Sequence, residues 1–390
     1  MQSIFFFITG QNLNSTRKAL LVPDEPSFTL LEIASLIEAF YPGFTPALRH
    51  GLFRVVETDV PSIDPRFMHF MERSVSIRML GSLDFRFSSR KDNATDAMAD
   101  ILGQMAGSAE LLRFIKSLRG KYATFAIDRV YITANIPSAA EQAVKEGLGD
   151  LIATHARLEG DFKHPDLVAN AVVTYTRVVP RAFVLVVTFH GTHEHFKDYA
   201  ERRARNRPVF EIGTMNPPLT SLMMNICHPR MGAGTLLLDP LCGSGGILIE
   251  ALVRGIFSIG LDIDWAAISG CLKNLKHFNN GMKAGFNILH ASIFALPFRE
   301  TNGITRSSLH VVTDPPYGRM ESLKNVPLER YILKMISLES DKLCFAIPEN
   351  TAEEICAKIR ENPSYEIKNV QVKREHPAFA RAIVLIEKIC

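Results

Sequence analysis

The spacing of apolar positions changes several times along the chain, and each spacing predicts a different kind of element. In the first half, apolar residues at helical spacing alternate with short apolar runs. They predict helices at 27–40, 92–107, 108–118 and 138–156, and strands at 3–9, 52–56, 74–79, 122–127, 166–175 and 181–189. This order of elements is typical of α+β modules.

From residue 235 onward, predicted strands and helices alternate regularly. The strands are expected at 235–238, 257–262, 309–313, 342–347 and 383–387, and the helices at 246–254 and 265–278. Such alternation predicts a mainly parallel, doubly wound sheet. The fold class is therefore expected to be α/β, with α+β modules preceding a Rossmann-like domain.

Length and composition narrow the class of protein. A chain of 390 residues is expected to form two or three domains of about 150 residues each. It has no apolar run of the roughly 18 residues that a membrane span needs, and its start lacks a basic signal-peptide region. Six cysteines without a CxxC pair disfavour a zinc ribbon, and the histidines at 190, 193 and 195 lack partner ligands. We therefore expect a cytoplasmic protein with no membrane partner and no metal site.

A glycine-rich turn follows the strand at 235–238. The sequence there reads Leu-Asp-Pro-Leu-Cys-Gly-Ser-Gly-Gly, with the carboxylate of Asp239 at the strand end. Glycines allow a ligand to approach the backbone closely. A carboxylate would repel the pyrophosphate of NAD but would attract an ammonium group. This favours S-adenosylmethionine, although a tight turn without a ligand would have the same composition.

Asp262 ends the next strand, where an acidic residue hydrogen-bonds ribose hydroxyls in nucleotide-binding folds. Asp264 is expected to cap the following helix instead. The alternative for both residues is a solvent-facing cap.

A strand then runs into Asp314-Pro315-Pro316-Tyr317. The prolines hold the backbone extended and remove two N–H donors. The Asp314 carboxylate and the Pro315 carbonyl could accept both N–H bonds of an exocyclic amine, while Tyr317 stacks on the base. By contrast, Asn216-Pro217-Pro218-Leu219 lacks the aromatic residue and is expected to start a helix at the wall of the cofactor site.

Together, residues 239–246 and 314–317 resemble the amino-group class of S-adenosylmethionine-dependent methyltransferases. Residues 161–166, 205–217, 313–319 and 376–381 resemble THUMP-containing methyltransferases, and most closely the archaeal tRNA (guanine(10)-N2)-methyltransferase family. The resemblance implies a ferredoxin-like domain at 1–85, a THUMP RNA-binding domain at 86–190, a basic linker at 191–210 and a methyltransferase domain at 211–390. It also implies S-adenosylmethionine as cofactor and tRNA as partner, and DNA is disfavoured by the RNA-type module.

The expected site residues fall into three groups. Catalytic roles are predicted for Asp314, Pro315, Pro316 and Tyr317. Cofactor contacts are predicted for Asp239, Pro240, Cys242, Gly243, Ser244, Gly245, Gly246, Asp262, Ile263 and Ser292, the last where the family places its contact to the adenine amino group. Arg202, Arg203, Arg205 and Arg207 are expected to contact RNA phosphates, although a charge run of this kind can also be a solvated linker.

Other functions remain open at this stage. The same catalytic turn would serve a guanine-N2 enzyme for tRNA position 6 or rRNA, or an adenine-N6 enzyme. A non-catalytic RNA-binding protein and a nicotinamide dehydrogenase are disfavoured by the intact Asp239 and Asp314 motifs. The family also implies a small zinc-binding activator subunit as a further possible partner.

Overall fold

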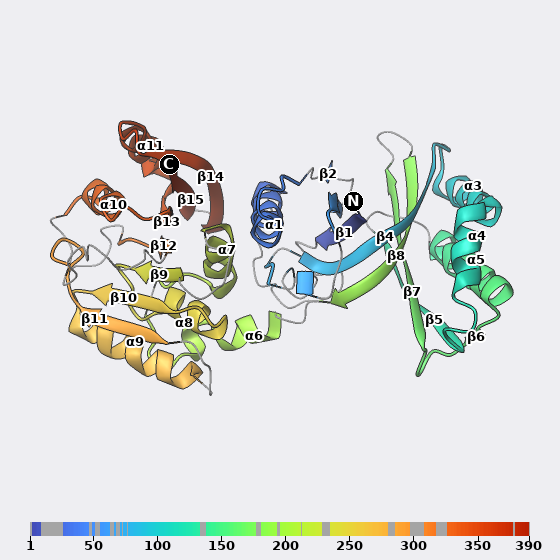
Figure 1. The fold of residues 1–390 in the computed structure, drawn as a ribbon, viewed down its shortest axis with the longest axis horizontal. Helices are drawn as coiled ribbons and strands as arrows, with labels where there is room; N and C mark the ends of the chain where they lie inside the picture. The colour runs from blue at the N-terminus through green and yellow to red at the C-terminus, as the bar shows by residue number, and fades with distance from the viewer. Residues whose placement is uncertain are drawn as a thin grey trace. The chain divides into compact units, whose positions relative to one another are not determined.

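The chain, analysed as a computed structural model, divides into two compact units. The structure describes residues 2–8, 26–46, 49–50, 55–62, 66–67, 71, 73–75, 77–132, 138–176, 181–192, 196–211, 213–227, 235–279, 285–296, 308–316, 326–376 and 379–389. Unit 1 holds strands β1 to β8 with helices α3 to α5. Unit 2 holds helix α1, residues 73–75 and the chain from helix α6 onward (Figure 1).

Unit 1 is built on one eight-stranded sheet. Its strands are β1 (Gln2–Ile8), β2 (Arg49–His50), β3 (Val55–Val60), β4 (Ile77–Ser89), β5 (Thr124–Ile132), β6 (Glu159–Gly160), β7 (Leu167–Thr176) and β8 (Arg181–Thr192). Their order is β2-β3-β1-β4-β8-β7-β5-β6, with β5 parallel to β6 and β7 and the other pairs antiparallel. Because β4 pairs with β8, the strands of the expected ferredoxin-like and THUMP segments form a continuous sheet.

The helices of unit 1 are α3 (Ala94–Gly107), α4 (Ala109–Ser117) and α5 (Ser138–Ala156), which confirms the three predicted helices. Asn93 caps α3 by accepting a hydrogen bond from the Asp96 N–H, and Ser108 caps α4 in the same way through Leu111. Side-chain caps of this kind satisfy N–H groups that a helix leaves unpaired. A single apolar core joins the three helices to the sheet.

Unit 2 contains a seven-stranded, mainly parallel sheet. Its strands are β9 (Thr235–Asp239), β10 (Ser258–Asp262), β11 (Phe286–His290), β12 (Ser308–Thr313), β13 (Lys342–Pro348), β14 (Tyr365–His376) and β15 (Phe379–Lys388). They lie in the order β11-β10-β9-β12-β13-β15-β14. Only β15 runs antiparallel to its neighbours β13 and β14. The predicted doubly wound α/β sheet is confirmed.

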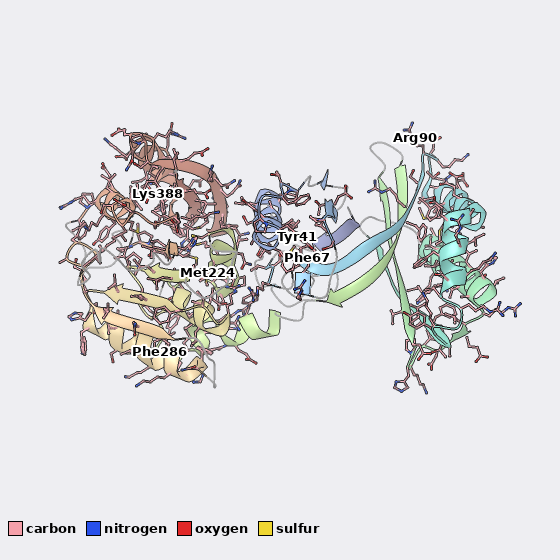
Figure 2. The ribbon with its side chains drawn as sticks, in the orientation of Figure 1. Tyr41, Phe67, Arg90, Met224, Phe286 and Lys388 are labelled. Carbon is pink, nitrogen blue, oxygen red and sulfur yellow. The ribbon has the colours of Figure 1, made fainter. Side chains whose placement is uncertain are left out.

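Helices cover both faces of this sheet. They are α1 (Pro26–Phe40), α6 (Phe196–Glu201), α7 (Pro217–Cys227), α8 (Gly246–Val253), α9 (Trp265–Phe278), α10 (Leu328–Ile336) and α11 (Ala352–Arg360). Successive strand residues point to opposite faces. Leu237 accordingly joins a core with Met224 of α7 (labelled in Figure 2), whereas Leu238 joins a core with α10 and α11. Two-sided burial explains why the central strands β9 and β13 are mostly apolar.

Helix α1 packs against α7 although nearly 200 residues separate them in sequence. The Glu32 side chain is 0% exposed, and it accepts hydrogen bonds from Asn225 Nδ2 (2.6 Å), Ser74 Oγ (2.9 Å) and the Val75 N–H (2.7 Å). A buried carboxylate needs partners of this kind. The expected 1–85 segment is thus shared between the two units, and the division at 85, 190 and 210 stays a prediction.

Candidate active site

The residues predicted to hold a ligand gather at the carboxyl ends of the parallel strands in unit 2. Strands β9, β10 and β12 are hydrogen-bonded in parallel, so their final residues reach the same edge of the sheet. The turns after them line a cavity of about 820 Å³. Its wall includes Asp239, Pro240, Cys242, Gly243, Ser244, Gly246, Asp262, Ile263, Ser292, Asp314, Pro315 and Pro316. Three motifs that are far apart in sequence therefore meet around one cavity.

The glycine-rich turn after β9 requires its glycines. Gly243 and Gly245 have φ angles of +49° and +87°, a region that other residues rarely adopt. A Cβ atom on Gly245 would lie only 2.6 Å from Cys271 Sγ. The Gly243 N–H donates to Asp262 Oδ2 over 2.9 Å, and the Gly245 N–H donates to the Cys242 carbonyl over 2.9 Å. Hydrogen bonds within the turn and to Asp262 therefore hold the turn in place without a ligand.

Asp239 lies at the end of β9 and is only 2% exposed. Its Oδ1 accepts hydrogen bonds from the Thr313 hydroxyl (2.8 Å) and the Leu241 N–H (3.3 Å). Burial, partly opposed by these hydrogen bonds, raises the pKa of Asp239 from 3.8 to about 7. A cationic ligand in the cavity would favour its ionised form.

Asp262, at the end of β10, uses both carboxylate oxygens to hold backbone. Besides Gly243, it accepts from the Asp264 N–H over 2.9 Å, and burial raises its pKa. Asp264 accepts a hydrogen bond from the Ala266 N–H and caps α9, as the sequence predicted. Ile263 between them is 48% exposed, so an apolar side chain faces the open end of the cavity.

Beyond β11, the cavity has a partly aromatic wall. Ser292 Oγ accepts a hydrogen bond from the Phe294 N–H over 3.2 Å. The Phe294 ring lies 5.2 Å from the Tyr331 ring, and both residues line the cavity. Trp265, in contrast, is outside the cavity wall and packs edge-on against His290. Phe294 was not singled out from the sequence, because an isolated aromatic residue carries no local signal.

The turn after β12 begins with Asp314, which faces the same cavity. Asp314 Oδ2 lies 3.3 Å from Nη2 of Arg381, a residue of β15. The same nitrogen donates to the Gly213 carbonyl over 3.2 Å. Pro315 and Pro316 complete the described part of the turn, and Tyr317 lies outside the described residues. The acidic end of the predicted catalytic turn is therefore close to the glycine-rich turn.

This arrangement agrees with a comparison against protein families. Residues 204–378 match the family described as RMKL-like, methyltransferase domain. This segment is therefore similar to the methyltransferase domain of that family. The match covers the whole cavity wall apart from the two β15 residues Phe379 and Arg381.

The chain is also similar to named relatives and to a solved structure. The chain is 26% identical over 299 residues to the tRNA (guanine(10)-N2)-dimethyltransferase of Methanothermobacter thermautotrophicus, covering 75% of this chain and 80% of that protein. It is 29% identical over 208 residues to the enzyme of the same name from Methanocaldococcus jannaschii, covering 53% and 56%. The structure of TrmN from Thermus thermophilus is 15% identical, with a TM-score of 0.48 and full coverage of both chains.

Two charged residues of the methyltransferase domain were missed by the sequence analysis. Glu211 Oε2 accepts a hydrogen bond from the Ser244 N–H over 2.9 Å, so it braces the glycine-rich turn. Arg381 reaches Asp314 from the last strand. Glu211 lies within the 205–217 segment that resembles the family, which is the one local signal that could have found it. Arg381 required knowledge of the strand order.

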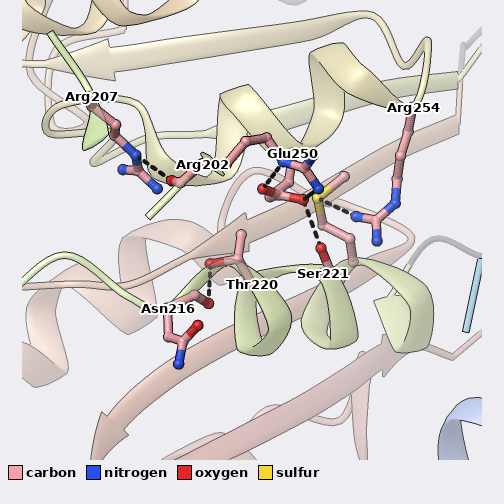
Figure 3. Close-up of polar contacts among 8 residues, drawn as sticks. Arg202, Arg207, Asn216, Thr220, Ser221, Glu250 and Arg254 are labelled. Carbon is pink, nitrogen blue, oxygen red and sulfur yellow. Dashed lines mark hydrogen bonds and ion pairs between the residues drawn. The ribbon is translucent and has the colours of Figure 1, made fainter. Parts of the chain in front are cut away.

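The predicted RNA-binding arginines differ in their surroundings (Figure 3). Arg202 donates to both carboxylate oxygens of Glu250, over 2.7 and 3.2 Å, and Glu250 also accepts from the Ser221 hydroxyl. Arg207 is 6% exposed and donates through Nε to the Arg202 carbonyl. Its two terminal nitrogens have no hydrogen-bond partner in the part of the chain that the structure describes. Arg207 thus lies inside the domain, whereas Arg202 is half-buried against Glu250.

Arg205 is exposed and Arg203 is half-buried. Contact with an RNA phosphate stays a prediction for all four arginines, and Arg202 and Arg207 already have protein partners. The sequence pattern could not separate the four, because Glu250 lies almost 50 residues downstream of Arg202.

The Asn216-Pro217-Pro218 segment starts a helix, as predicted. Helix α7 begins at Pro217, and the Asn216 carbonyl accepts the Thr220 N–H over 3.1 Å. Met215 and Thr220 line the cavity. The segment is therefore a wall of the site, and it holds no second catalytic turn.

Two further predictions concern absent features. Among the described residues, no group of three or more His, Cys, Asp or Glu side chains could hold a metal ion, and His193 and His195 lie outside those residues. No helix in the described part of the chain is long and apolar enough to cross a membrane.

Proposed function

We propose that this protein transfers a methyl group from S-adenosylmethionine to the exocyclic N2 amine of guanosine at position 10 of tRNA. The products are N2-methylguanosine and, after a second transfer, N2,N2-dimethylguanosine. The observation that carries the proposal is the meeting of Asp314 and the glycine-rich turn in one cavity. The names of the archaeal relatives supply the substrate and the position.

The cavity has the right chemistry for this cofactor. Its described wall carries five carboxyl groups, from Glu211, Asp239, Asp262, Asp264 and Asp314, and one basic side chain, Arg381. An acidic wall favours a ligand with cationic ammonium and sulfonium groups. Asp239 and Glu211 flank the glycine-rich turn and suit the ammonium end, while Asp262 suits the ribose and Ser292 the adenine.

The turn that starts with Asp314 and Pro315 would bind the target amine. When bound, S-adenosylmethionine supplies an electrophilic methyl group carried by a sulfonium. The Asp314 carboxylate accepts an N–H bond of the amine and stabilises positive charge as it develops on the nitrogen. Asp314 then takes the proton that the methylated amine releases. Tyr317 is proposed to stack on the base.

RNA binding is proposed for an aromatic and basic surface of unit 1. Phe162 is 80% exposed and Tyr122 is 37% exposed. Asp166 Oδ2 accepts from the N–H groups of Ala123 and Thr124, so the 161–166 loop lies beside the start of β5. The exposed basic residues here are Arg119, Lys121 and Lys163. Aromatic faces and phosphate-binding cations are what single-stranded RNA needs.

A base inside a tRNA stem must leave the stack before the amine can reach Asp314, at a cost of a few kcal/mol. Arg203, Arg205 and the unit 1 surface would offset this cost through phosphate contacts. A cytoplasmic location and a small zinc-binding activator subunit stay predictions.

The test is a methyl-transfer assay with labelled S-adenosylmethionine and an unmodified tRNA transcript, followed by nucleoside mass spectrometry. A transcript with guanosine 10 changed to adenosine is the matched control. We expect N2-methylated guanosine that is lost with this transcript and with Asp314→Ala. Normal turnover in Asp314→Ala would overturn the catalytic assignment, and methylation that persists in the changed transcript would overturn position 10. Absence of product both with and without added activator subunit would overturn the enzymatic function.

A further inference from the structure

Arg381 is the one basic side chain among the described residues that line the cavity. It is 5% exposed, so its charge is taken out of water and needs a partner. Several carboxyl groups line the same cavity, and among the described residues Arg381 forms an ion pair with Asp314. Within the described cavity wall, the one cation therefore contacts the residue proposed to meet the target amine.

The geometry ties three distant segments together. Arg381 Nη2 lies 3.3 Å from Asp314 Oδ2 and 3.2 Å from the Gly213 carbonyl. Its guanidinium stacks 5.1 Å above the ring of Phe379, which also lines the cavity. The β13–β15 register places Arg381 opposite Pro348, near the carboxyl end of β13. One guanidinium thus links the turn after β12 to the loop before α7.

We propose that Arg381 is a positioning residue for methyl transfer. It fixes the Asp314 carboxylate toward the cavity and compensates its charge beside the other acidic side chains. This inference rests on the proposed function, since it assigns Asp314 the acceptor role there. Arginine suits the task because its guanidinium is always protonated and Nη2 carries two N–H groups, one for the carboxylate and one for the carbonyl.

Loss of this contact should affect turnover more than binding. Without Arg381, Asp314 would lose this ion pair and its charge would no longer be compensated beside Asp239. Removing partners that orient functional side chains typically lowers activity by about 10- to 100-fold. We therefore expect Arg381→Met to lower kcat by about 10- to 100-fold, while KM for tRNA and Kd for S-adenosylmethionine change little.

The experiment is a kinetic double-mutant cycle with the full chain. Arg381→Met, Asp314→Asn and the double variant are compared in single-turnover methyl transfer to the tRNA transcript. If Arg381 acts through Asp314, its replacement causes no further loss in the Asp314→Asn background. Arg381→Lys, which keeps the charge but loses the guanidinium, should recover part of kcat. The matched control is Arg374→Met on β14, where the side chain is 62% exposed and pairs with Glu349.

A kcat close to wild type in Arg381→Met, or losses that multiply in the double variant, would overturn the positioning role. If Arg381→Met does not fold, Arg381→Lys in the two Asp314 backgrounds makes the same comparison. A wild-type enzyme that methylates no guanosine would overturn the proposed function itself, so the two failures are distinguishable.

Discussion

Replacing Asp239 with asparagine is expected to stabilise unit 2 at alkaline pH relative to the wild type. Burial raises the pKa of Asp239 from 3.8 to about 7, so ionising this side chain in the folded protein is unfavourable. One pKa unit corresponds to about 1.4 kcal/mol, and the shift of roughly three units therefore amounts to about 4 kcal/mol. Asparagine keeps the oxygen that accepts from Thr313 and Leu241 but carries no charge.

The sign of the pH dependence follows from the raised pKa. Below pH 4 the Asp239 side chain is protonated in both states and its stabilising contribution is fully present. Between pH 4 and 7 the unfolded chain loses the proton while the folded chain keeps it, so the free energy of unfolding falls as pH rises. Above pH 7 Asp239 is ionised in both the folded and the unfolded state, and its stabilising contribution is lost completely. In the Asp239→Asn variant, this contribution to the pH dependence of the unfolding free energy is absent.

Urea unfolding between pH 4 and 8 measures the effect. The chain has one tryptophan, and Trp265 lies on α9, so its fluorescence reports on unit 2 alone. The difference in unfolding free energy between wild type and Asp239→Asn should change by about 4 kcal/mol across this range. Asp264→Asn is the matched control, because asparagine caps a helix equally well and the side chain is exposed. A difference that stays constant with pH would refute the reasoning.

Three further predictions follow from buried or exposed contacts. Gly245→Ala should lower the affinity for the cofactor more than about tenfold, because a positive φ costs other residues roughly 1–2 kcal/mol and the new Cβ would clash with Cys271. Calorimetry measures this affinity, and an unchanged value would contradict the prediction. Glu250→Ala should cost about 3–5 kcal/mol in thermal unfolding because it strands the charge of Arg202, and a loss below about 1 kcal/mol would count against the buried pair. Phe162→Ala should weaken tRNA binding by about 5- to 100-fold, as expected for a lost base stack; equal affinity in filter binding would remove Phe162 from the RNA surface.

The predicted cofactor and catalytic residues met in one cavity because local pattern and topology agree there. Asp239, Asp262 and Asp314 each end an apolar strand, and parallel strands bring such ends to one edge of a sheet. The positive φ angles of Gly243 and Gly245 could be expected from the same segment, since glycine adopts them freely. Residues whose position depends on one strand and its own turn were therefore predictable.

Residues that act across the fold were not predictable in this way. Arg381 belongs to the strand that runs antiparallel to its neighbours, and it meets Asp314 only because β15 lies beside β13. Arg202 and Arg207 belong to a charge run that is typical of a solvated linker, yet Arg202 pairs with the buried Glu250 and Arg207 is itself buried. In both cases a contact of long sequence separation decides the role of an arginine, and no local pattern encodes that contact.

The position of α1 shows how the same limit affects domain boundaries. Glu32 lies in a predicted helix where a charged residue normally marks the solvent face, but it is buried against Asn225 and the 74–75 backbone. Removing α1 would take away the carboxylate that accepts from the Asn225 amide, which also donates to the Arg73 carbonyl. It would also uncover the apolar face of α7 that packs against α1. A fragment that starts after β8 contains every strand of the methyltransferase sheet, but it lacks a helix that belongs to the same compact unit. The methyltransferase unit is therefore discontinuous in sequence, and its stability depends on a segment that a boundary drawn from composition assigns to another domain.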